Sequence, residues 1–235
     1  SNPPAAPFSG QEQADDVVVP DEIQRLGDPR AESYDDFLKQ IVAYPSAAIR
    51  KRLVKKITAR SVDQSYGQKA IHVLRGALLD PSMDVRLAAT QVVANWGALE
   101  ASLPFAKQAV PELALNLQHD DELLARATIR SLRNFEADAA SALPHLRWKL
   151  RQVDNSDSMV FDLMRVLGEM GPAAAEAVPE LEAIAMSSGS GNGIAWDMIA
   201  KIGDQAAIRR GLESDDTSVQ LHSSGAAEFL ENLEP

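Results

Sequence analysis

A thirteen-residue pattern occurs four times in this chain and limits the possible fold more than any other feature of the sequence. The four copies align without gaps, their starts are 39, 35 and 32 residues apart, and they begin at Val85, Leu124, Met159 and Gly191. The last apolar position holds Trp96, Phe135, Met170 and Ile202, and the position three residues before it holds Val93, Leu132, Leu167 and Ile199. This spacing indicates helices with one buried face. Helices this short need copies of themselves on both sides to bury that face.

A second short unit lies between these copies and extends the repeat. Ala-Val/Leu-Pro-x-Leu occurs at residues 109–113, 142–146 and 177–181, and the segments starting at Pro45 and Pro81 share a Pro-Ser-x-x-aliphatic-Arg pattern. Three of the four aligned helices are closed by a glycine, which tolerates the left-handed backbone at a helix end: Gly97, Gly171 and Gly203. We therefore expect an all-α protein, an α-solenoid of about five to six stacked antiparallel helix pairs. The solenoid is predicted over residues 32–235, after a flexible acidic leader at residues 1–31.

Acidic turns precede the helices of the repeat. They are Asp80-Pro81, Asp120-Asp121, Asp154-Asn155 and Asp215-Asp216. Asp and Asn at these places can accept hydrogen bonds from the free N–H groups of the next helix. We expect these residues to be helix caps rather than catalytic groups.

With these motifs the chain resembles HEAT-repeat proteins, specifically the short repeats of phycobilisome-lyase-type HEAT-like domains. The residues that carry the resemblance are Asp84-Val85-Arg86, Ala88-Ala89, Gly97, Val110-Pro111-Glu112-Leu113 and the segment 171–181. The resemblance covers about residues 44–232, and it departs from the pattern at Glu136, which stands where a glycine is expected. It also departs in a longer 97–110 connection and in the Gly/Ser-rich stretch 187–193. By analogy of fold alone, the resemblance implies a protein that binds other proteins.

The sequence offers no recognisable catalytic or metal-binding motif. It has no cysteine, which excludes thiolate zinc sites and cysteine nucleophiles. None of the four histidines lies three to five residues from another, as zinc ligands often do. The glycine-rich stretch 187–193 lacks the Lys-Ser/Thr that completes a phosphate-binding loop. We predict no catalytic residue, metal or cofactor, although a catalytic triad assembled in space leaves no trace in spacing.

Charge is distributed unevenly along the chain. The formal net charge is −11, yet residues 39–79 contain nine Lys or Arg and a single Asp. The basic patch that we single out there consists of Arg50, Arg52, Lys56 and Arg60. One interpretation is a polar cap on the first repeat, which must present a solvated face to water. The other is a docking patch for an acidic partner or a phosphate, and the two are compatible.

The register of the repeat also predicts a groove. On the helices that carry the pattern, the positions opposite the core stripe are mostly polar, and HEAT-like stacking would place them on a concave surface. The predicted partner-binding residues are Lys51, Lys55, Gln91, Asn95, Arg126, Arg130, Asn134 and Arg165. This row suits an extended polar or acidic peptide. The alternative is that the Arg side chains only pair with Asp in neighbouring repeats, and Arg86 is the first case to examine.

Two functions remain open at this point. The favoured one is a non-enzymatic scaffold that binds a partner protein through the concave face. Trp148, which we expect to be partly exposed, is a minor contact candidate. The alternative is a nucleic-acid-binding or lyase-like HEAT-repeat enzyme. DNA binding is usually the property of a basic domain, whereas the pI here is about 4.8. Nucleic acid is therefore disfavoured as a partner, and no membrane span is expected.

The leader gives two further expectations. Its opening residues are rich in Pro, Ala, Ser and Gly and suggest a tether behind a removed export signal, so we favour an exported protein, although an ordinary disordered tail has the same composition. Nine acidic residues lie in the segment 12–36, which runs directly into the basic first repeat. We expect residues 12–36 to fold back over Arg50–Arg60 or the adjacent groove, because tethering raises the effective concentration of the opposite charges.

Overall fold

All regular structure in the described part of the chain is helical. The computed structural model describes residues 34–57, 64–154, 157–187 and 191–232. The α-helices are α2 (Tyr34–Ala43), α3 (Ala47–Lys55), α4 (Gln64–Ala77), α5 (Met83–Gly97), α6 (Leu103–Ala106), α7 (Val110–Leu115), α8 (Glu122–Leu132), α9 (Leu143–Gln152), α10 (Ser158–Glu169), α11 (Val178–Ala185), α12 (Asn192–Ile202), α13 (Gln205–Leu212) and α14 (Thr217–Glu231). Short 3₁₀ helices join them: η1 (Lys107–Ala109), η2 (Asn116–Gln118), η3 (Arg133–Ala142) and η4 (Gly171–Ala177).

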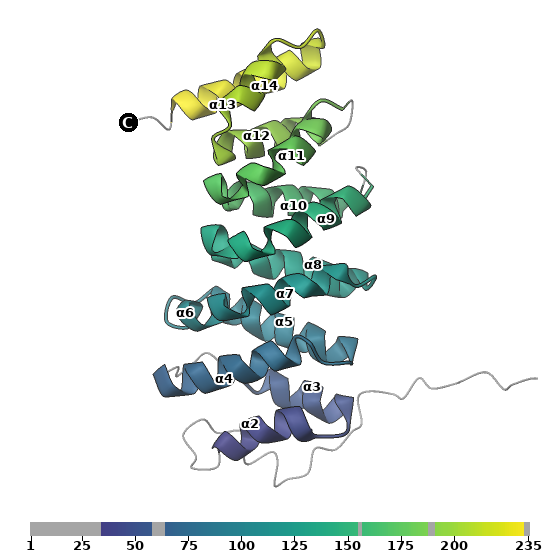
Figure 1. Cartoon of the computed structure of the whole chain (residues 1–235), viewed down its shortest axis with the longest axis vertical. Coiled ribbons are helices and arrows are strands. Elements are labelled where there is room, and N and C mark those ends of the chain that lie inside the picture. Colours follow the sequence, from purple (N-terminus) through teal and green to yellow (C-terminus); the bar gives the residue numbers. More distant parts are fainter. Residues whose placement is uncertain (1–33, 58–63, 155–156, 188–190, 233–235) are drawn as a thin grey trace, which may run out of the picture.

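The helices stack into an elongated solenoid, from α2 and α3 at one end to α13 and α14 at the other (Figure 1). One row consists of α3, α5, α8, α10, α12 and α14, each in contact with the next. The second row consists of α2, α4, α6 and α7 with η1, α9 with η3, and α11 with η4. With α13 beside α14, the described residues form six helix pairs. The expected all-α solenoid of five to six pairs is confirmed.

The core follows the predicted register. Val93, Leu132, Leu167 and Ile199 are fully buried, and Trp96, Phe135, Met170 and Ile202 are at most 4% exposed. Buried apolar side chains form one cluster from Phe37 in α2 to Ala226 in α14. Each pair therefore buries its stripe against its neighbours, as expected for stacked repeats.

The acidic turns act as caps in part. Asp121 accepts a hydrogen bond from the Leu124 amide at 2.8 Å, and Asp216 accepts one from Ser218 at 2.8 Å, so both predicted caps are confirmed. At α10 the expected cap, Asp154-Asn155, is wrong, because Asp157 caps the helix by accepting from the Met159 amide. The N-cap of α5 is Ser82 rather than Asp80. Asp80 has another role, described below.

The residues that close the aligned helices differ in their backbone. Gly171 and Gly203 have φ of 57° and 88°, the left-handed region that favours glycine. Glu136, at the equivalent position, also has a positive φ of 46°. Gly97 instead ends α5 next to the ring of Phe135, where a Cβ atom would lie 2.8 Å from the ring. Gly97 is therefore required for close packing rather than for a left-handed turn.

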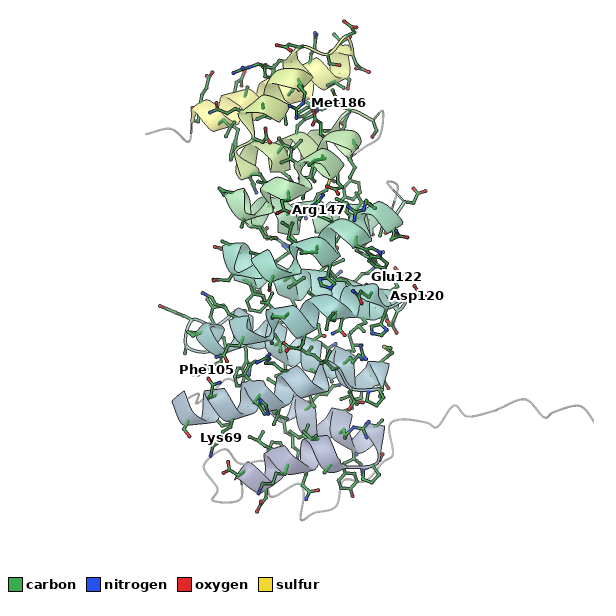
Figure 2. The ribbon with its side chains drawn as sticks, viewed as in Figure 1. Lys69, Phe105, Asp120, Glu122, Arg147 and Met186 are labelled. Atoms are coloured by element: carbon green, nitrogen blue, oxygen red, sulfur yellow. The ribbon has the colours of Figure 1, made fainter. Side chains whose placement is uncertain are left out.

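The solenoid has two long edges, and each is formed by the ends of different helices. Asp120 and Glu122, at the start of α8, lie at one edge, away from Lys69 and Phe105 toward the other (Figure 2). The predicted boundary between leader and solenoid, at residues 31 and 32, lies outside the described residues, and the first described helix begins at Tyr34. Within the described ranges, none of the helices has the length and apolar character needed to cross a membrane.

Candidate protein-binding face

Many of the arginines join one repeat to the next. Arg75 pairs with Glu112, Arg133 with Glu169, and Arg210 with Glu182, in each case across a repeat boundary. A further arginine, Arg147 on α9, is labelled in Figure 2 and lies 3.0 Å from a carboxylate oxygen of Glu180. These pairs link consecutive helices of the stack, so most of these guanidinium groups already have a partner within the fold.

Three of the eight predicted partner-binding residues are also engaged within the stack. Lys51 lies 3.3 Å from a carboxylate oxygen of Asp84. Arg126 donates to Glu122, Asp157 and Ser158 at 2.8 to 3.0 Å. Asn134 donates to the Ala94 carbonyl at 2.9 Å, which ties η3 to α5. Arg126 thus forms the kind of Arg–Asp pair between repeats that was the alternative to partner binding.

The other five lie on the exposed side of the α3, α5, α8 and α10 row. They are Lys55, Gln91, Asn95, Arg130 and Arg165, and all five side chains are exposed. Within the described ranges none of them takes part in a hydrogen bond or ion pair. They are available to bind a partner at no cost to the contacts between repeats.

Four of these side chains occupy one line that crosses the repeats. Lys55, Gln91, Arg130 and Arg165 hold the same position of the aligned helices, and the next copy of the pattern puts Asp197 on α12 in that position. Asp197 is exposed as well. We call this line, Lys55–Gln91–Arg130–Arg165–Asp197, the polar column. Sequence reasoning stopped at Arg165, although the alignment that begins at Gly191 already placed Asp197 in register.

A polar hollow lies beside the column at the end of α8. It has a volume of about 570 Å³ and is lined by Gly97, Ala98, Arg130, Arg133, Asn134, Glu136 and Glu169. Two hydrogen bonds of 3.0 and 2.8 Å hold the Arg133 guanidinium against Glu169. Arg130 has no such contact among the described residues, and it lies on both the column and the hollow. The hollow therefore offers room for a polar side chain next to an available cation.

Arg50, the first residue of the basic patch, belongs to the interior contacts. Its guanidinium donates to both carboxylate oxygens of Asp80 at 2.8 and 2.9 Å and to the carbonyls of Tyr44 and Pro45. The Arg50 and Asp80 side chains are only 12% and 11% exposed. Arg52 is exposed and Lys56 is half-buried, while Arg60 lies outside the described residues.

Most of the leader that was expected to cover this patch, residues 12–33, also lies outside the described ranges. Two acidic residues of the segment 12–36, Asp35 and Asp36, are described, and both make other contacts. Asp35 pairs with Lys69 and Asp36 with Lys39. The fold-back of the leader stays a prediction.

Two carboxylates that bind arginines of the stack, Asp80 and Asp157, have a lowered pKa. Burial would raise the pKa of Asp80, but hydrogen bonds from Arg50 and the Ser82 amide and the charges of Arg50 and Arg86 outweigh it. The result is a pKa below the ordinary 3.8. The pKa of Asp157 is lowered chiefly by the hydrogen bond from the Met159 amide and also by Arg126. Both groups stabilise the fold in their ionised form.

Arg86, in the Val-Arg pair of the repeat, also has a structural role. Its guanidinium donates to the Asp80 carbonyl at 2.6 Å and to Asn116 Oδ1 at 3.3 Å, and it lies 2.5 Å from His119 Nε2. Asn116 in turn donates to Thr90 at 3.4 Å. The proposed Arg86–Asp pair is thus a bond to the main chain of Asp80. This polar cluster joins the α4–α5 turn to the turn between α7 and α8 in the next repeat.

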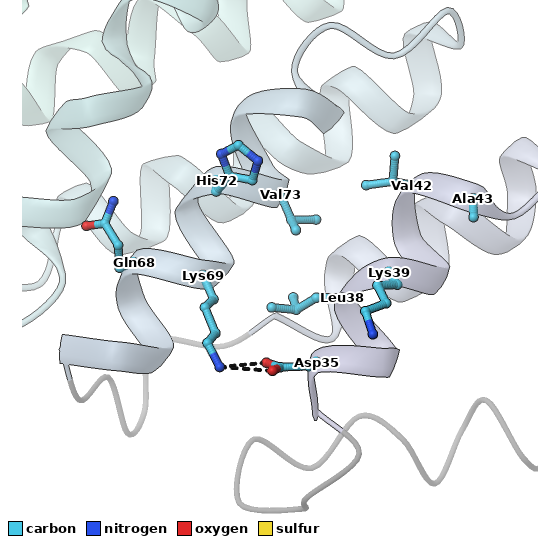
Figure 3. Close-up of a pocket in the computed structure, with 9 residues that line it drawn as sticks. All are labelled: Asp35, Leu38, Lys39, Val42, Ala43, Gln68, Lys69, His72 and Val73. Carbon is cyan, nitrogen blue, oxygen red and sulfur yellow. Dashed lines mark hydrogen bonds and ion pairs between the residues drawn. The ribbon is translucent and has the colours of Figure 1, made fainter.

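An apolar groove lies away from the polar column, between α2 and α4. It has a volume of about 840 Å³ and contains Leu38, Val42, Ala43 and Val73, with Lys69 bonded to Asp35 at its rim (Figure 3). Val42 is 67% exposed. On α9, in the same second row of helices, Trp148 is 37% exposed, as expected of a contact candidate. In the described part of the chain, no group of three or more Asp, Glu, His or Cys side chains is arranged to hold a metal ion.

Comparison with known proteins supports the architecture. No protein-family model and no curated protein sequence matches this chain. Among solved structures, an engineered protein matches with a TM-score of 0.58 and 17% identity over 86% of this chain and 98% of its own. A designed armadillo repeat protein, YIII(Dq)4CqI, matches with a TM-score of 0.55 and 17% identity over 83% of this chain and 99% of its own. The fold is an armadillo-like α-solenoid.

A further designed armadillo repeat protein was solved in complex with the peptide (KR)4. It matches with a TM-score of 0.56 and 16% identity over 83% of this chain and 98% of its own. Identities this low establish a shared fold and nothing finer.

Proposed function

We propose that this chain is a non-enzymatic scaffold that binds a partner protein, with an extended segment of the partner lying along the polar column. The observation that carries the proposal is the line of exposed polar side chains at one repeat position. Elsewhere on the stack, arginines such as Arg50, Arg75 and Arg147 are held by carboxylates of the neighbouring repeat. Arg130 and Arg165 are held by none among the described residues.

The fold supports this use of the column. Stacked repeats create a long surface on which one side chain per repeat is presented at a regular interval. One structural neighbour, a designed armadillo repeat protein, is complexed with a peptide, so a solenoid of this kind can bind a peptide. The column ends in Asp197, but its other charged members are cations, so the bound segment differs in charge from that basic peptide.

We also propose that the repeats are of the HEAT type. Most repeats here contain two main helices, as in α4 with α5 or α11 with α12, which is the HEAT arrangement. The Asp84-Val85-Arg86 motif supports the same assignment, since Arg86 links the turn to the following repeat.

Selection of peptides on the folded protein tests the function. A displayed library of unstructured segments is selected on the wild-type chain, and the binders are measured against four variants. We expect Arg130→Ala with Arg165→Ala to lower affinity by about tenfold or more, because charge-assisted hydrogen bonds are lost. Arg209→Ala, an exposed arginine on α13, is the matched control and should bind as the wild type does.

Val42→Asp probes the competing surface, the groove between α2 and α4. Binders that lose affinity with Val42→Asp or with Trp148→Ala, but keep their affinity for the Arg130→Ala/Arg165→Ala variant, would place the binding site on the second row of helices. That result would contradict the proposed function.

A further inference from the structure

The charges of the polar column change sign along the stack. Lys55 on α3, Arg130 on α8 and Arg165 on α10 are cations, whereas Asp197 on α12 is an anion. All four side chains are exposed, and in the described part of the chain none has an ion-pair partner. The column therefore has a basic part and a single acidic end.

The basic part of the column stands out in this molecule. The chain as a whole has a formal net charge of −11, and many of the other arginines are paired with nearby carboxylates, as Arg133 is with Glu169. Three cations kept clear of such partners at one repeat position form a local site for anions on an acidic protein. Complementary charges of this kind set the specificity and the register of binding.

The spacing of the column suits an extended polypeptide. Packed helices lie roughly 8–10 Å apart, and an extended chain rises about 3.3 Å per residue, so one repeat corresponds to about three peptide residues. A carboxylate at every third residue or so can then meet Lys55, Arg130 and Arg165 in turn. Gln91 lies between Lys55 and Arg130 and can hydrogen-bond to the peptide main chain or to a side chain.

We infer that the ligand of the polar column is an extended acidic peptide segment of about thirteen residues that carries one basic residue at the end lying over Asp197. This rests on the proposed function and adds the chemistry and polarity of the ligand. Arg130 and Arg165 bind successive carboxylates through their planar guanidinium groups, a geometry suited to two hydrogen bonds each. Asp197 pairs with the basic residue and repels a segment that is acidic along its whole length.

Nucleic acid fits the column less well than a peptide. Its phosphates would meet Lys55, Arg130 and Arg165, but Asp197 and the half-buried Glu169 near the column oppose a uniform polyanion. The net charge of −11 adds long-range repulsion.

Synthetic peptides measured by calorimetry or fluorescence anisotropy test the inference. The probes are a peptide of about thirteen residues with Glu at every third position, the same peptide with a Lys at its N-terminal or C-terminal end, and a version with Lys in place of every Glu. We expect one of the Lys-ended peptides to bind about tenfold more tightly than the all-acidic peptide. Asp197→Lys should reverse that order, and the all-Lys peptide should bind weakly.

The variant arm uses matched charge reversals. Arg165→Glu and Arg209→Glu change the net charge equally, and only Arg165→Glu should weaken the acidic peptides, by about tenfold or more. Equal effects of the two variants, an unchanged order of peptides in Asp197→Lys, or tighter binding of single-stranded DNA than of any peptide would overturn the inference. Neutral or basic segments that bind and respond to the column variants would overturn only the acidic assignment, leaving the proposed function intact.

Discussion

The guanidinium of Arg50 on α3 binds both carboxylate oxygens of Asp80, which lies thirty residues later in the turn before α5. The same guanidinium donates to the carbonyls of Tyr44 and Pro45 at 2.8 and 2.9 Å. One side chain therefore connects the turn inside the first described repeat to the turn inside the second. This contact shows why a basic residue in a basic segment need not be a docking residue.

Arg50→Ala is predicted to destabilise the solenoid by roughly 3 kcal/mol, because it leaves a nearly buried carboxylate without its partner. Arg50→Lys should fall between Arg50→Ala and the wild type, since an ammonium group keeps the charge and loses the two-pronged geometry. Chemical denaturation measures both. Lys55→Ala, at an exposed position of the same helix, is the control and should change stability by less than about 0.5 kcal/mol. Equal losses for Arg50→Ala and Lys55→Ala would contradict the structural role of Arg50.

Acid should weaken the fold through Asp80 and Asp157. The pKa of each carboxyl group is lower in the folded chain than its ordinary value of 3.8. The stability that each contributes is therefore present above that value and is lost as the pH falls through the folded pKa. Urea midpoints between pH 6 and pH 2 should fall less steeply in Asp80→Asn than in the wild type, because Asn does not titrate. Parallel curves for the two proteins would mean that Asp80 does not couple folding to protons.

Gly211 on α13 has no room for a side chain. A Cβ atom there would lie 2.5 Å from the ring of Trp196 and 2.7 Å from the Cβ of Ser223. Gly211→Ala should therefore cost about 1–3 kcal/mol, as overpacking of a rigid core does. Gly225→Ala on α14 is the matched control, since nothing lies within 4 Å of its Cβ position, and it should stabilise the helix by up to about 1 kcal/mol. Thermal unfolding that moves in the same direction for both variants would refute this packing.

Glu136 is predicted to store backbone strain. It has φ 46° and ψ −126°, a conformation that costs a residue with a side chain about 1–3 kcal/mol. Glu136→Gly should therefore stabilise the protein by about 1 kcal/mol after the entropy of glycine is taken into account. Gly171→Ala, at the equivalent position with φ 57°, should have the opposite sign. A destabilised Glu136→Gly variant, measured by chemical denaturation, would indicate that the carboxylate makes a contact more valuable than the strain it imposes.

The sequence was sufficient for the architecture because apolar spacing alone specifies which face of a repeated helix is buried. Trp96 and Leu167 lie in the core where the register placed them. The caps were less predictable, since Asp154, Asn155 and Asp157 are chemically similar and only the backbone selects Asp157.

Side-chain partners across repeats were the least predictable feature. The register shows that Arg126 and Arg130 share one face, but it does not show that Arg126 reaches Asp157 while Arg130 reaches no carboxylate among the described residues. That difference depends on how each helix is rotated against the next. Asp197 was missed for a different reason: the copy at Gly191 begins in the Gly/Ser-rich stretch 187–193, where the chain departs from the repeat pattern, so its polar positions were not considered.

Site-specific crosslinking tests the central claim, that the partner lies along the polar column, most directly. A photoreactive amino acid is placed at Gln91, which is exposed within the column, or at Leu115 on α7, which is 37% exposed on the other row. A binding segment selected on the wild-type protein is then added and the mixture is irradiated. We expect a covalent adduct from position 91, suppressed by Arg130→Glu with Arg165→Glu, and none from position 115. An adduct from position 115 with none from position 91 would contradict the claim.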